Sequence, residues 1–161
     1  MDDAFRTLYA WVRETREILF SYCDAMDLAD YTYAAPDMGW NSIRNTHVHV
    51  AGCYWFWLAR VLGEERPALG PELYPDVTAV RTAFAAVDDL VERFLTRYAG
   101  EMDAPVARKV NWQEEPLVIT PRWLISHVIT HEFHHKGQIT FLGRMRGHIA
   151  PDTDLVLPTI P

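Results

Sequence analysis

HEFHHKGQ occupies residues 131–138, and His127 lies one helical turn before it. Four of the seven histidines of this chain therefore fall within nine positions. On a helix, residues four apart lie on one face, so the rings of His131 and His135 would lie close enough to bind a single metal ion. We therefore predict that this segment is helical and that it presents histidines to a metal.

Apolar residues recur at helical spacing in four segments of the chain, of which the histidine-rich segment is the last. Thr120 can act as its N-cap, and Pro121 suits its first turn. The connectors are short or contain several Pro and Gly residues, which disfavour regular structure. These features predict one all-α domain over residues 1–161, built as a bundle of helices. The predicted helices cover residues 3–26, 41–62, 76–99 and 120–146.

The residues before the last helix change their spacing. Side chains of different character alternate from Val106 to Trp112, and Pro116 introduces a turn before Leu117. A period of two residues indicates extended structure. We predict a short β-hairpin or another extended excursion over residues 105–119.

Net charge and cysteine content narrow the possible partners and the compartment. Asp and Glu outnumber Lys and Arg by 22 to 15, and the resulting charge of −7 argues against binding to nucleic-acid phosphates. Cys23 and Cys53 are too few for a disulfide framework, so we expect two small buried side chains in a reducing cytoplasm. We find no signal peptide and no apolar stretch long enough to cross a membrane. We expect a cytoplasmic protein that acts on a small-molecule substrate and binds neither nucleic acid nor membrane.

The predicted helix over residues 41–62 carries two further histidines, His47 and His49. Two residues turn a helix by about 200°, so both rings cannot face the same interior. His49 shares its face with Cys53, and spacing favours it modestly as a metal ligand, which would leave His47 at the rim. A hydrogen-bonded core histidine is the alternative at either position.

Two ligands on the last helix need at least a third from another helix, and His49 is the best-placed residue to supply it. Three neutral imidazoles with one open position are typical of a catalytic divalent site. Zinc and nickel both suit nitrogen ligands, and the sequence does not choose between them.

The same residues also match the H-E-x-x-H pattern of zinc proteases, in which Glu132 would be the general base. The pattern is only five residues long, and no substrate-binding sheet is evident, so we disfavour a protease. We expect Glu132 either beside the metal, as an auxiliary group, or in solvent. His127 is a second auxiliary candidate, although packing with a satisfied hydrogen bond is its simpler role. His134 could replace His135 as a ligand through i,i+3 spacing.

Two blocks of sequence resemble the DinB/YfiT-like family of metal-dependent proteins. Residues 41–49 read NSIRNTHVH, and residues 125–138 read ISHVITHEFHHKGQ, with the more specific ending H-x-x-H-H-x-G-Q. The likeness spans nearly the whole chain in the order of its elements. It implies a four-helix bundle with up-down-down-up topology, often dimeric, and a divalent metal site on His49, His131 and His135.

Characterised members of that family include transferases and isomerases that use low-molecular-weight thiols. The resemblance therefore implies a metal-dependent transferase that adds such a thiol to small electrophiles, and a Lewis-acidic ion would favour the reactive thiolate. A hydrolase using metal-activated water, and a non-catalytic stress-response or binding module with a structural metal, are the alternatives. Ile129 and Phe133 lie away from the histidine stripe, and we predict a homodimer contact through these side chains or through the helix over residues 3–26.

Overall fold

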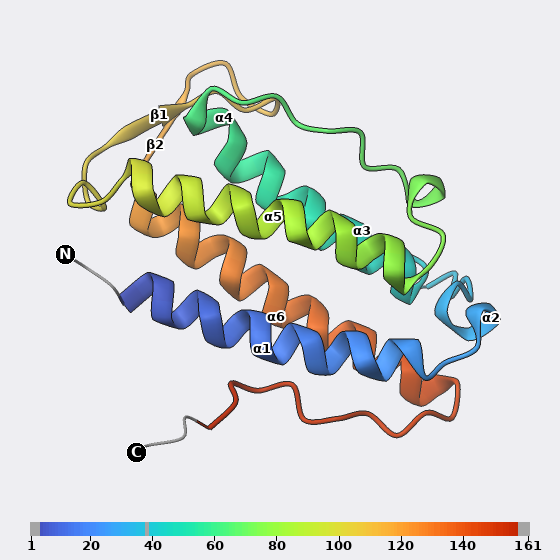
Figure 1. Cartoon of the computed structure of the whole chain (residues 1–161). Coiled ribbons are helices and arrows are strands. Elements are labelled where there is room, and N and C mark those ends of the chain that lie inside the picture. Colours follow the sequence, from blue (N-terminus) through green and yellow to red (C-terminus); the bar gives the residue numbers. More distant parts are fainter. Residues whose placement is uncertain (1–3, 38, 158–161) are drawn as a thin grey trace.

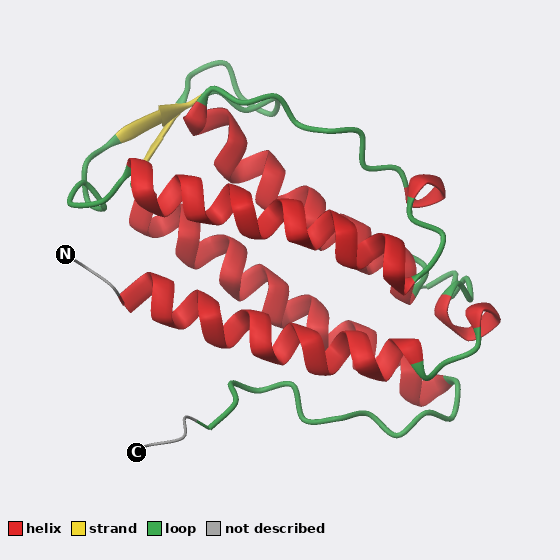
Figure 2. Cartoon of the chain, in the orientation of Figure 1, coloured by secondary structure: helices red, strands yellow, loops and turns green. Residues whose placement is uncertain are grey.

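The computed structural model describes residues 4–37 and 39–157, and this part of the chain is mostly helical (Figure 1, Figure 2). A small antiparallel hairpin precedes the last helix, with Val106 opposite Ile119. The elements are α1 (Ala4–Asp24), α2 (Leu28–Tyr31), α3 (Ile43–Tyr54), a π-helical turn (Trp55–Ala59), α4 (Arg60–Leu62), a 3-10 turn (Pro71–Leu73), α5 (Val77–Arg97), β1 (Val106–Arg108), β2 (Leu117–Ile119) and α6 (Pro121–Met145). The four predicted helices and the hairpin are thus confirmed.

Side-chain caps explain where three of the helices begin. Ser42, Asp76 and Thr120 each accept a hydrogen bond from a backbone N–H in the first turn of α3, α5 and α6. Such caps stabilise a helix by satisfying one of its four unpaired N–H groups. Gly63 ends α4 in the left-handed conformation, with φ of 72°. Local sequence chemistry therefore places the helix ends within a few residues of the predicted positions.

The predicted second helix runs through α3 and α4, but it contains a π-helical turn that the sequence did not predict. Arg108, at the end of β1, donates a hydrogen bond to the Phe56 carbonyl inside that turn. Its guanidinium also lies 4.1 Å from the Phe56 ring centroid and 4.7 Å from that of Trp57. A π turn disturbs the regular backbone ladder of a helix. The hairpin therefore supplies the side chain that holds this irregular turn.

The long helices enclose one apolar core, in which α3 contacts both α5 and α6 while α1 contacts the same two helices. Figure 1 shows the hairpin at the end of the molecule where α4 ends and α6 begins. Ile129 is buried in this core, so the homodimer contact predicted for Ile129 and Phe133 cannot use the first of them. No helix among the described residues is long and apolar enough to cross a membrane.

Candidate metal centre

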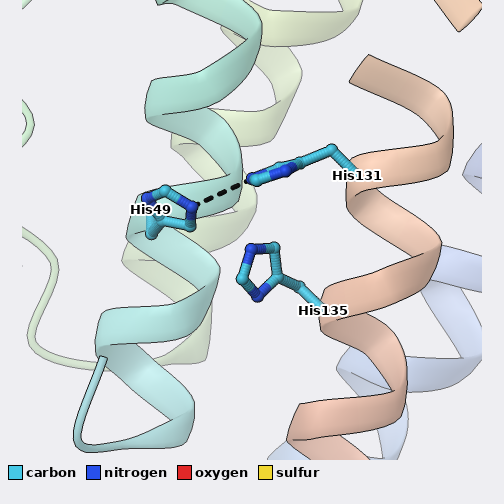
Figure 3. A group of neighbouring side chains, drawn as sticks. All are labelled: His49, His131 and His135. Atoms are coloured by element: carbon cyan, nitrogen blue, oxygen red, sulfur yellow. Dashed lines mark hydrogen bonds between the residues drawn. The ribbon is translucent and has the colours of Figure 1, made fainter. Parts of the chain in front are cut away.

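His49 on α3 and His131 and His135 on α6 point toward one another across the contact between the two helices (Figure 3). The Nε2 atoms of His49 and His131 are 2.9 Å apart. One nitrogen from each of the three rings lies within 4.8 Å of the other two. The structure thus brings together the three histidines that the sequence nominated as ligands.

Gln138, one turn beyond the histidines on α6, fixes the orientation of the His135 ring. Its Oε1 atom lies 2.7 Å from His135 Nδ1, which therefore carries the proton and donates it. The lone pair of His135 is then on Nε2. Gln138 Nε2 lies 3.0 Å from His134 Nε2, so exposed His134 contacts the glutamine. Gln138 therefore contacts both His134 and His135. Metal-ligating histidines are commonly oriented by such a hydrogen bond to the ring nitrogen that does not bind the metal.

The three rings are uncharged at neutral pH. Burial, followed by the mutual proximity of the rings, lowers the pKa of His49 to about 3 and that of His131 to about 4. Burial also lowers the pKa of His135. The positive charge of Arg66 adds to the effect at His49. Neutral imidazole is the form that binds a metal ion, so these ligands need no deprotonation near pH 7.

His127 lies beside the histidine group rather than within it. Its ring stacks on Trp123, with centroids 4.8 Å apart and planes 5° apart, and it meets the edge of Trp57. Together with Cys53 and His131 it forms a second set of donor atoms within 4.8 Å of one another. Aromatic packing, and not the predicted hydrogen bond, is the contact that orients His127 among the described residues.

Glu132 is buried in an ionic network. The sequence had left two other positions open, beside the metal or in solvent, and the structure shows neither. The two carboxylate oxygens of Glu132 accept hydrogen bonds from Arg16 Nε and Nη2, both at 2.9 Å, and from the Tyr54 hydroxyl at 2.7 Å. The Lys136 ammonium is 3.6 Å away. Burial alone would raise the pKa of Glu132, but the adjacent Arg16 outweighs it and holds the pKa below its usual value. A carboxylate held by these partners is a structural anion, which is why the protease pattern does not describe this site.

His47 is a core residue and not the rim residue that spacing suggested. Its side chain is buried, and Nδ1 lies 3.1 Å from the hydroxyl of buried Tyr31. Burial lowers the pKa of His47 to about 3. The ring is therefore a neutral hydrogen-bonded packing group, which was the alternative considered for this position.

A pocket of about 510 Å³ opens beside His49 and His131. Trp40 covers one side of it and stacks on the His49 ring, with centroids 3.8 Å apart. Residues from two connectors and from the hairpin complete the walls, and sequence reasoning did not identify them because those segments have no periodic pattern. The lining residues are Trp40, Asn45, Val48, His49, Gly52, Cys53, Phe56, Trp57, Arg66, Leu69, Pro71, Trp112, His127 and His131.

Comparison with protein-family models gives a match to the model described as DinB family, over residues 1–159. A search of curated proteins finds no match. The family match covers every described element, including the hairpin and both helices that carry the histidines.

Proposed function

Because this chain belongs to the DinB family, we propose that it binds one divalent metal ion, zinc or nickel, through His49, His131 and His135. We propose further that it catalyses metal-dependent transfer of a low-molecular-weight thiol to a small electrophile. The observation that carries the first step is the convergence of three neutral imidazoles from two helices. The thiol and the reaction class rest on the family resemblance.

The donor set suits such an ion. Two nitrogens bound to one tetrahedral zinc at about 2.0–2.1 Å lie roughly 3.3 Å from each other. The pair His49 and His131 is already at 2.9 Å, and His135 is within 4.8 Å of both. When bound, the ion would supply Lewis acidity that favours the thiolate form of a thiol.

The chain's own residues prepare the site in two ways. Gln138 holds His135 in one tautomer, and the buried surroundings keep all three rings neutral. The pocket gives a small molecule access to His49 and His131, which a purely structural metal site would not require. This arrangement supports a catalytic site over the non-catalytic module.

Metal analysis of untagged protein tests the site. We expect about one equivalent of metal in the wild type and at least a tenfold lower content in His49→Ala, His131→Ala and His135→Ala. His148→Ala is the matched control and should retain its metal, because its Nε2 atom lies 2.8 Å from Asp30 and the residue belongs neither to the histidine group nor to the pocket lining. Unchanged metal content in all three ligand variants would show that the assignment is wrong.

Turnover tests the reaction. Thiols such as glutathione and cysteine, assayed with 1-chloro-2,4-dinitrobenzene, should give a thioether and chloride in a reaction that a chelator stops and added metal restores. The thiolate sulfur forms the new bond to carbon, chloride leaves, and the thiol proton passes to solvent. Activity on esters or amides without any thiol would instead identify the hydrolase that uses metal-activated water.

We also propose that the helices form a four-helix bundle with up-down-down-up topology. The helix contacts and the courses of α1, α3, α5 and α6 in Figure 1 support this arrangement. A homodimer stays a prediction. Burial of Ile129 removes one of the two apolar side chains that suggested a contact on α6, whereas Phe133, the first helix and the family resemblance remain as its grounds. The mass of the protein in solution tests that prediction.

A further inference from the structure

The pocket beside the histidines has aromatic walls drawn from three separate parts of the chain. Phe56 and Trp57 come from the π-helical turn, Trp112 from the hairpin, and Trp40 from the residues before α3. The rings of Phe56 and Trp112 stack with planes 28° apart, and Trp57 meets Trp112 at 64°. Such surfaces favour a flat apolar molecule, because planar groups stack on aromatic faces and their burial removes apolar area from water.

Arg66 is the one side chain in this lining that carries a charge at neutral pH, since the lining histidines are neutral or largely so. Its Nη2 atom lies 3.2 Å from the position that a Cβ on residue 52 would occupy, so Gly52 allows the guanidinium to lie against α3. The absence of a side chain at position 52 therefore leaves room for this cation at the pocket wall.

Arg66 also has no carboxylate partner among the described residues, in contrast to most of the other arginines. Nearby Glu64 is bound by Arg93 through two hydrogen bonds, at 2.9 and 2.7 Å. The ion pairs of the described residues engage Arg6, Arg13, Arg16, Arg81, Arg93, Arg97, Arg122 and Arg146. An arginine at a pocket wall whose guanidinium is not engaged by a carboxylate of the described residues is suited to a planar anion, because the guanidinium fork matches a carboxylate.

We propose that the pocket binds a small molecule with a flat apolar body and a carboxylate, with Arg66 holding the carboxylate. If this molecule is the electrophilic substrate, the inference rests on the proposed function. The overall charge of −7 does not attract anions, so recognition of the carboxylate depends on this single local cation. The aromatic side chains hold the body of the molecule, next to His49 and His131.

Isothermal titration of the full chain with 2-naphthoate and with its uncharged analogue 2-naphthamide tests the proposal. We expect the wild type to bind the carboxylate about tenfold more tightly than the amide, a preference that should shrink in high salt. Arg66→Gln should abolish the preference and leave amide binding unchanged. Arg60→Gln is the matched control, because Arg60 is an exposed arginine from the same region that does not line this pocket.

Gly52→Ala provides a second variant that keeps the charge. The added Cβ would lie 3.2 Å from Nη2 and shift the guanidinium by a few tenths of an ångström, so we expect the preference for 2-naphthoate to fall but not to disappear. Equal affinity of wild-type protein for the two probes, or retention of the preference in Arg66→Gln, would overturn the role of Arg66. If neither probe binds at millimolar concentration, the flat apolar body is wrong.

All titrations are run on chelator-treated protein and repeated after loading with zinc. The Arg66 effect should be present in the metal-free protein, so failure of the metal assignment would leave this readout intact. A preference for the carboxylate that appears only with zinc and survives Arg66→Gln would show that the metal, and not Arg66, binds the anion. That result would overturn the inference while supporting the proposed metal site.

Discussion

Gln138 accepts a hydrogen bond from His135 Nδ1 at 2.7 Å and so determines which nitrogen of that ring is free to bind a metal. The two residues lie one turn apart on α6, so the helix itself sets their relative position. This pairing converts a flexible imidazole with two tautomers into a ligand with one defined donor atom.

Gln138→Ala should therefore weaken metal binding about tenfold or more, as is usual when a hydrogen-bond partner of a ligand histidine is removed. Competition with a chromophoric chelator measures the affinity. Gln138→Glu keeps an acceptor oxygen in the same place, and we expect it to bind metal at least as well as the wild type. Equal affinities in Gln138→Ala and the wild type would show that the hydrogen bond has no influence on the site.

Cys23 gives a pH dependence that does not involve the metal site. Burial raises the pKa of its thiol from 9.0 to about 12. At pH 8 the folded protein should hold roughly a thousandfold less Cys23 thiolate than the unfolded chain. Alkylation of Cys23 by iodoacetamide should be slower by a similar factor. Because the folded state keeps its proton longer, this contribution to stability is present below pH 9 and is lost as the pH rises toward 12.

Mass spectrometry after timed alkylation measures the modification of Cys23. In the folded protein its rate should rise about tenfold per pH unit between pH 8 and pH 10 without reaching a plateau, whereas in urea it should level off above pH 9. A plateau near pH 9 in the folded protein would mean that the Cys23 thiol is not desolvated.

The sequence predicted the helices and part of the site because both depend on local spacing. Apolar periodicity set the four long helices, and the four-residue interval placed His131 and His135 on one face. The choice of His49 over His47 depended on how α3 rotates against α6, which spacing favoured only modestly. Packing determines which of the two histidines faces α6, since the Tyr31 hydroxyl binds His47 in the core.

The rest of the site depends on contacts between distant parts of the chain. Glu132 is paired with Arg16, which lies 116 residues away in sequence, so no local pattern could assign its carboxylate to the core. Trp40, Arg66 and Trp112 belong to connectors or to the hairpin turn, where the sequence has no period from which to predict a direction. Only the fold brings these side chains to one pocket.

Glu132→Ala separates a structural role of this carboxylate from a catalytic one. The change leaves the guanidinium of Arg16 buried with one partner fewer, and removing one member of a buried ion pair costs about 3–5 kcal/mol. We expect a matching loss in the free energy of unfolding, measured with urea, and an unchanged amount of metal per folded molecule. Glu17→Ala, which removes an exposed partner of Arg81, should cost less than about 1 kcal/mol. Full stability with lost turnover in Glu132→Ala would restore the general-base interpretation.

Gly143 of α6 lies against the Tyr22 side chain of α1, and its substitution tests how tightly the two helices pack. A Cβ at this position would overlap the Tyr22 hydroxyl and crowd the end of Met26, so Gly143→Ala should destabilise the protein by about 1–3 kcal/mol. Gly137→Ala is the matched control on the same helix, because no atom lies within 4 Å of the added group and alanine favours a helix by up to about 1 kcal/mol over glycine. Urea unfolding of both variants measures the difference. Tyr22→Phe removes the nearest overlapping atom and should recover part of the loss in Gly143→Ala, whereas an equal loss in the double variant would place the strain elsewhere.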